Sequence, residues 1–220
     1  MTMTPGRIAP ARRGGYASLA LLGLVSACGG ASSAGPVTVL RAAAHEASAT
    51  GAFEADLTTL VRSDKGAVRS PPLTLVYNEP DRIAVYPAGS VSGMPLAIFI
   101  DHVQYAAAPG RPGYYVAAPV MVSQFDLLDV LSSSRRVSRA GPNTLVVTGP
   151  IDLHQPATVS PMGSLVVSTI SVTMRSGRPY RLEVNGTVGG FSVQETLVYH
   201  DYGLAPVIEA PAPERIVHSG

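Results

Sequence analysis

Short segments with a two-residue period of apolar side chains recur from residue 51 to residue 199 and limit the folds open to this chain. In the first segment, Phe53, Ala55 and Leu57 alternate with polar residues, which is the pattern of a strand with one buried and one wet face. Residues that favour turns, mainly Gly, Pro, Ser and Asp, separate the segments. Successive short strands with short turns predict an antiparallel meander that has one large apolar face.

The period predicts strands along most of the chain, with Asn185-Gly186 as a hairpin turn near its end. The expected strands cover residues 53–62, 71–77, 82–86, 96–100, 103–107, 114–118, 143–148, 151–153, 165–175, 180–184 and 191–199.

Two segments, 36–48 and 120–134, have instead the period of amphipathic helices. Their apolar faces carry Val37, Leu40 and Ala44 in the first segment, and Val122, Phe125, Leu128 and Leu131 in the second. We expect these two helices to pack on the apolar face of the meander and to bury it.

The first 27 residues have the organisation of an export signal. Arg7, Arg12 and Arg13 form a basic start, and the apolar run 17–25 is shorter than the ~20 residues that a membrane-spanning helix needs. We expect residues 1–27 to be removed. Because of the Arg12-Arg13 pair, the sequence does not decide between export by the general route and export by the twin-arginine route.

The residues Val25-Ser26-Ala27-Cys28 resemble the lipobox of bacterial lipoproteins. In those proteins the cysteine receives a diacylglycerol and becomes the first residue of the mature chain. The resemblance implies that Cys28 anchors the chain in a membrane, because stable anchoring needs two acyl chains and a diacylglyceryl group supplies both. Residues 28–35 would then form a flexible tether. The alternative is an ordinary secretory signal with a chance cysteine.

Charge and composition exclude several classes of protein. Loss of the three signal arginines changes the formal net charge from +1 to about −2, which argues against a dedicated nucleic-acid binder. With 46% hydrophobic and 14% charged residues, the chain is not of the disordered class. A single cysteine cannot form an intramolecular disulfide or a multi-thiolate metal site.

No catalytic or metal site emerges from the motifs. The segment Gly89–Gly93 has Val at the nucleophile position of a G-x-S-x-G elbow, so we interpret it as a loop. The histidines are scattered, and the neighbours His200 and Asp201 would point to opposite faces of a strand. Glu54 and Asp56 share one strand face, which solvation explains. The sequence therefore predicts no enzyme, no cofactor and no metal site.

The apolar residues allow two interpretations. Branched aliphatic side chains on several strands and on the second helix could pack into a closed core. They could equally line a concave cavity for an acyl chain, which needs apolar area with few polar contacts.

Several motifs resemble the mycobacterial LppX, LprA, LprF and LprG lipoproteins over residues 36–213. The lipobox, the Ala-rich first helix and a first strand of the form G-x-F-x-A-x-L are part of the resemblance. The most specific part is the ending, with Gly177-Arg178-Pro179, Tyr199, Asp201-Tyr202-Gly203, Pro206-Val207-Ile208 and Pro211.

The resemblance implies an α+β fold related to LolA and LolB. The expected architecture is a strongly curved, half-open antiparallel β-sheet, a half-barrel, with helices on its concave side and an apolar cavity between. A single domain would span residues 36–213, followed by a tail at 214–220. The expected lining of the cavity is Leu75, Val85, Ile98, Ile100, Phe125, Leu128 and Val167.

In function, the resemblance implies a protein anchored through Cys28 on the outer face of the cell membrane. It would bind acylated lipids or lipoglycans and carry them across the envelope, with an envelope transporter as partner. The alternative is an envelope sensor or protein-binding module on the same fold, without lipid cargo.

Overall fold

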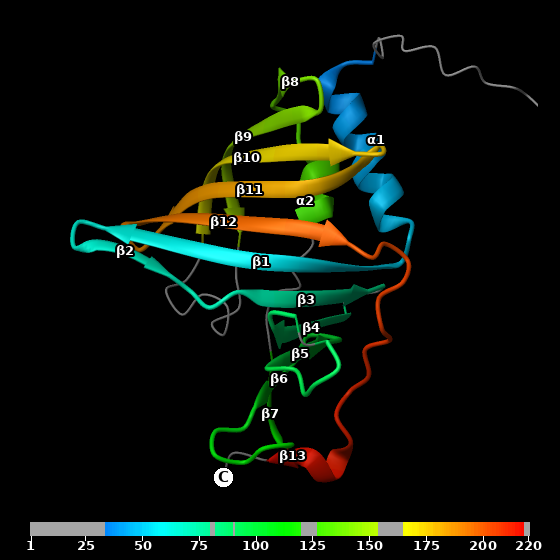
Figure 1. Cartoon of the computed structure of the whole chain (residues 1–220), viewed down its shortest axis with the longest axis vertical. Helices are drawn as coiled ribbons and strands as arrows, with labels where there is room; N and C mark the ends of the chain where they lie inside the picture. Colours follow the sequence, from blue (N-terminus) through cyan, green and yellow to red (C-terminus); the bar gives the residue numbers. More distant parts are fainter. Residues whose placement is uncertain (1–33, 80–81, 90, 120–126, 154–164, 218–220) are drawn as a thin grey trace, which may run out of the picture. The chain divides into compact units, whose positions relative to one another are not determined.

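A computed structural model describes residues 34–79, 82–89, 91–119, 127–153 and 165–217, which belong to one compact unit of the chain. Within these ranges the chain forms two α-helices, one short 3₁₀-helix and thirteen strands (Figure 1). The helices are α1 (Pro36–Ser48), α2 (Leu127–Ser133) and η1 (Pro213–Arg215). The strands are β1 (Ala52–Ser63), β2 (Gly66–Arg69), β3 (Leu73–Asn78), β4 (Arg82–Pro87), β5 (Ala97–Ile100), β6 (Val103–Ala107), β7 (Tyr115–Pro119), β8 (Val137–Gly141), β9 (Thr144–Leu153), β10 (Leu165–Arg175), β11 (Arg178–Val188), β12 (Phe191–His200) and β13 (Ile216–Val217).

All thirteen strands belong to one sheet in the order β13-β7-β6-β5-β4-β3-β1-β12-β11-β10-β9-β8, and β2 pairs with β1. Every pair is antiparallel except β13 with β7. Strands β3 to β7 form a meander on one side of β1, and strands β12 to β8 form a second meander on the other side. The end strands β8 and β13 are not paired with each other, so this is the open α+β half-barrel that the family resemblance implied.

Both helices lie on one face of the sheet, which we call the helix side. Phe53, Ala55 and Leu57 of β1 point to this side and cluster with buried residues of both helices. Helix α1 contacts α2, β11 and β8, and Figure 1 shows α1 running across the ends of the upper strands. The two-residue period of the strands therefore produces one continuous apolar face beneath the helices.

Helix α1 has the bounds that the sequence predicted. Pro36 at its first position suits a helix start because its missing N–H is not needed there. Leu40, Ala44 and Ala47 are buried against the sheet, and small alanines let the helix approach the strands closely. Of the second predicted helix, α2 covers Leu127–Ser133, and residues 120–126 lie outside the described residues.

Strand β11 differs from the prediction, because it continues through Asn185-Gly186 to Val188. A Cβ atom at Gly186 would lie 2.5 Å from the carbonyl oxygen of Val166 on β10, so this glycine permits a close backbone approach instead of making a turn. The turn lies at Gly189-Gly190, and both glycines have positive φ.

Three further strands were not predicted. Strand β2 pairs with the far half of β1, and β8 pairs with β9 at one edge of the sheet. Strand β13 pairs with β7. The sheet therefore includes Ile216 and Val217, which follow residue 213, the expected end of the domain.

Candidate functional site

The helix-side face carries the larger of two clusters of buried apolar residues in the described part of the chain. It runs from β9 and β10 through β1 and β12 to β3, β4 and β5, and both helices contribute to it. Four of the predicted lining residues, Leu75, Val85, Leu128 and Val167, belong to this one cluster. The structure therefore brings together side chains that are 92 residues apart in the sequence, between Leu75 and Val167.

Two other predicted lining residues, Ile98 and Ile100, lie on the opposite face of the sheet. Leu75 pairs with Val85, and Val85 pairs with Ala97, so Ala97 and not Ile98 continues the helix-side row. The expected lining is corrected accordingly, because alternate residues of β5 point to opposite faces. Phe125, the last predicted residue, lies outside the described residues.

Ile98 and Ile100 are buried in a second apolar cluster beneath the C-terminal segment 205–212, which we call the strap. Ile208 of the strap is 4% exposed and packs in this cluster with Val76 and Tyr115. Its N–H donates to Asn78 Oδ1 at 2.6 Å, and Arg82 Nη1 donates to its carbonyl oxygen at 3.0 Å. The strap thus covers a face that the helices cannot reach.

Among the described residues, Glu195 is a buried acidic residue whose side chain lies on the helix side of the sheet. It lies on β12 between Val193 and Leu197, which are both members of the helix-side cluster, and it is 6% exposed. The alternation of β12 places Glu195 there, but the sequence alone did not show which face of that strand is buried.

On the face opposite the helices, three carboxyl groups surround His200. Its Nδ1 lies 2.7 Å from Asp201 Oδ2 and 3.9 Å from Glu54 Oε2, and its Nε2 lies 3.5 Å from Asp56 Oδ2. The β1–β12 register places Glu54 directly opposite His200. Asp56 also accepts a hydrogen bond from the Thr74 hydroxyl at 2.9 Å.

Electrostatics in this cluster favour a protonated imidazole. Burial lowers the pKa of His200, but the hydrogen bond with Asp201 and the charges of Asp56, Asp201 and Glu54 raise it above its ordinary value of 6.5. Burial raises the pKa of Glu54 above its ordinary value of 4.5, and His200 opposes that shift. The imidazolium is attracted to the surrounding carboxylates, and this attraction links β1 to β12 at the seam between the two meanders.

Sequence reasoning missed this cluster for a physical reason. We expected His200 and Asp201 to point to opposite faces, as strand neighbours do. Asp201 follows the last residue of β12 and has a φ of 51°, which turns its side chain back to His200. The side chains of Glu54, His200 and Asp201 have atoms that could bind a metal ion within 4.8 Å of one another. The distance of 2.7 Å between His200 Nδ1 and Asp201 Oδ2, however, is that of a direct hydrogen bond between these two side chains.

The characteristic ending of the chain makes structural contacts. Arg178 forms an ion pair with Glu46 of α1 at 3.0 Å and lies over the ring of Tyr202 at 5.6 Å. The Tyr202 hydroxyl donates to the carbonyl oxygen of Pro179 at 2.7 Å. Burial raises the pKa of Tyr202, so this hydroxyl stays protonated. These residues fasten α1 to the end of the sheet.

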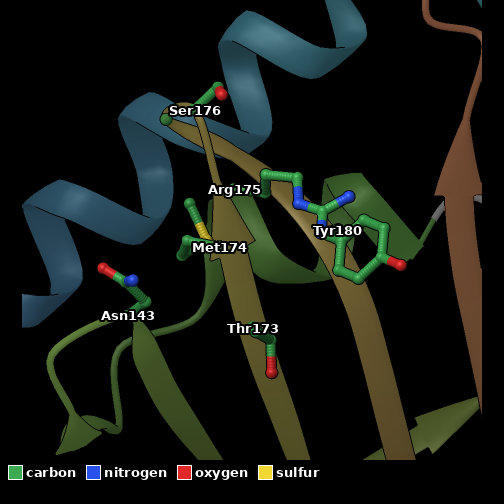
Figure 2. A pocket seen from close by; sticks show the side chains of 7 residues that line it. Asn143, Thr173, Met174, Arg175, Ser176 and Tyr180 are labelled. Atoms are coloured by element: carbon green, nitrogen blue, oxygen red, sulfur yellow. The ribbon is translucent and has the colours of Figure 1, made fainter.

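A hollow of about 360 Å³ lies at the turn between β10 and β11. Figure 2 shows the guanidinium of Arg175 over the ring of Tyr180, at 4.2 Å, while Met174 points toward α1. The lining residues are Asn143, Thr173, Met174, Arg175, Ser176, Gly177 and Tyr180. Most of them are polar, so this hollow does not suit an acyl chain.

Comparisons with known proteins are limited to solved structures, since no family model and no curated protein matches the chain. LprF from Mycobacterium bovis is similar with 14% identity and a TM-score of 0.36, covering 80% of this chain and 97% of LprF. A LolA superfamily protein from Nitrosomonas europaea is similar with 10% identity and a TM-score of 0.33, covering 81% and 96%. LprF is one of the four lipoproteins that the sequence resembles, and LolA is the related fold that this resemblance implies. Because both TM-scores are below 0.5, we base the fold and the function on the chain's own strand pairings and contacts.

Proposed function

We propose that this chain is a lipid-anchored envelope protein that binds acylated lipids or lipoglycans against its helix-side face, without catalysis. The observation that supports this is the continuity of that face. It crosses the seam between β1 and β12, so residues of both meanders share one apolar surface.

An acyl chain suits such a surface because its affinity comes from burial, at ~0.8 kcal/mol for each CH₂ group. The cover consists of α1 and α2, which contact each other and are not part of the strand pairing. The revised lining is Leu75, Val85, Leu128 and Val167, and Glu195 supplies a polar group on the same face. A few polar groups within an apolar surface are what orient a ligand.

The anchor in this proposal is Cys28, which lies outside the described residues. Among the residues that the structure describes, no helix is long and apolar enough to cross a membrane. In this proposal the acylated cysteine attaches the chain to the outer face of the membrane, and a transporter of the envelope is the partner that loads or unloads the lipid.

Native mass spectrometry of the purified protein, after incubation with a membrane lipid extract, tests the proposal. We expect a bound species with the mass of an acylated lipid. Val85→Phe should reduce this species strongly, because a larger side chain fills the helix-side face. Ile98→Phe is the matched control, since Ile98 is similarly buried but faces the strap.

Two outcomes would contradict the lipid-binding proposal. One is a protein that takes up no lipid from the extract. The other is equal loss of lipid in both variants, which would indicate general destabilisation. Absence of lipid together with one stable protein partner in a pull-down would favour the sensor or protein-binding alternative.

A further inference from the structure

Four exposed arginines lie on three segments that are neighbours in the fold: α1, the residues that follow α2, and β8. Helix α1 contacts both α2 and β8, and Figure 1 shows β8 beside the first turns of α1. Arg41 of α1 donates its Nε–H to the carbonyl oxygen of Ser132 on α2 at 3.0 Å. Ser132 is three residues before Arg135 in the sequence. We call this group the arginine patch: Arg41, Arg135, Arg136 and Arg139.

The patch has little internal charge compensation. Arg136 and Arg139 donate to backbone carbonyl oxygens, of Gly149 at 3.3 Å and of Pro142 at 3.2 Å. None of the ion pairs among the described residues includes an arginine of the patch, whereas Arg178 and Arg181 pair with glutamates. Each guanidinium of the patch therefore keeps N–H donors for an external anion.

A hollow of about 300 Å³ borders the patch, between residues 134–136 and residues 147–151 of β9. Arg135 and Arg136 are part of its wall. A recess with two guanidinium groups suits a phosphate, because arginine binds phosphate oxygens with several parallel N–H donors.

The position of the patch along the chain indicates which anion it meets. Helix α1 begins at Pro36, so the peptide steps between Cys28 and Pro36 span roughly 30 Å at most when fully extended. An acylated Cys28 would thus keep this end of the domain close to the membrane surface. The mature chain has a formal net charge of about −2, so attraction to an anionic surface needs a local basic patch.

We infer that the arginine patch binds the anionic phospholipid headgroups of the membrane in which the chain is anchored, and so holds the domain in one orientation on that surface. This inference rests on the anchor of the proposed function, but its test does not. It commits to a membrane surface and not to a nucleic acid or an acidic protein.

The test measures partition of the mature chain from residue 28, carrying Cys28→Ser so that no acyl group contributes. The vesicles contain phosphatidylcholine alone or with phosphatidylglycerol. Each arginine near an anionic surface contributes about fivefold to binding. We therefore expect R41Q/R135Q/R136Q/R139Q to bind phosphatidylglycerol vesicles about 600-fold more weakly, and binding should weaken as salt is raised.

The matched control changes four other exposed basic residues to Gln: Arg62, Lys65 and Arg69 of the β1–β2 hairpin, and Arg111. This control loses the same charge and should keep most of the binding. Equal loss in both variants, binding that is the same with neutral vesicles, or tighter binding to a DNA oligonucleotide than to phosphatidylglycerol would overturn the inference. A mass spectrum of the Cys28 peptide without lipid would refute the anchor and leave the vesicle result standing.

Discussion

The two meanders of the sheet are buried in different ways. In the meander that contains β10 and β11, side chains alternate between the helix side and solvent, so Leu182 is fully buried and its neighbour Arg181 is exposed. In the other meander, all four residues of β5 are buried. One half of the sheet has a single apolar face, and the other half has two.

The difference shows that the two faces of the sheet are covered in different ways. The helix side is apolar in both meanders, and it is the face to which we assign the acyl ligand. The opposite face carries a buried apolar cluster beneath the strap, which includes Ile208. Where no strap lies, the opposite face carries charged residues such as Glu54 and His200.

Substitutions in β11 should have the largest effect on stability and should depend strongly on which neighbour is changed. Leu182→Ala removes a fully buried side chain, and we expect it to lower the free energy of unfolding by ~2–5 kcal/mol in urea titrations. Arg181→Ala, on the opposite face, removes an exposed ion pair with Glu183 and should cost ~1 kcal/mol or less. Similar costs for both variants would show that this meander does not have a single buried face.

Substitutions in β3 should behave differently, because both neighbours are buried. Leu75→Ala opens a gap on the helix side, and Val76→Ala opens one beneath the strap. We expect each to lower the free energy of unfolding by about 2 kcal/mol. A negligible cost for Val76→Ala would contradict the covering role of the strap.

Much of this fold was predictable because it follows from local patterns. The bounds of α1 and the positions of β4, β6, β10 and β12 follow from hydrophobic period and turn residues. The short strand β8 was missed because its exposed edge residues show no such period. The turn at Asn185-Gly186 was predicted wrongly because the local preference of Asn-Gly for hairpins gave way to close packing on Val166.

The candidate site was less predictable, since it depends on pairing between distant strands. Leu75 and Val85 are cross-strand partners on the helix side, whereas Ile98 and Ile100 could not be assigned to a face before the β4–β5 register was known. The cluster around His200 likewise needed both the β1–β12 register and the positive φ of Asp201.

The smallest predicted effect concerns pH and the face that lies opposite the helices. The pKa of His200 is raised in the folded state, so its contribution to stability is complete below the unfolded pKa near 6.5 and is lost as pH rises through the folded pKa. The raised pKa of Glu54 acts in the same direction. We expect the free energy of unfolding to fall by ~1 kcal/mol or less above pH 6.5.

His200→Gln should remove most of that dependence in urea titrations across this pH range. The groups that face His200 are Glu54, Asp56 and Asp201, with Tyr86 of β4 near Glu54. A rise in stability above pH 6.5, or an unchanged pH profile in the variant, would contradict the attraction between protonated His200 and these carboxylates.

Photocrosslinking with a diazirine-bearing fatty acid tests most directly which face of the sheet binds lipid. After irradiation and peptide mapping by mass spectrometry, we expect adducts on helix-side residues such as Leu75, Val85 and Leu128. Ile98 and Ile100, in the cluster beneath the strap, should carry none. Adducts confined to the strap side, or no saturable labelling at all, would contradict the assignment of the helix-side face as the lipid-binding surface.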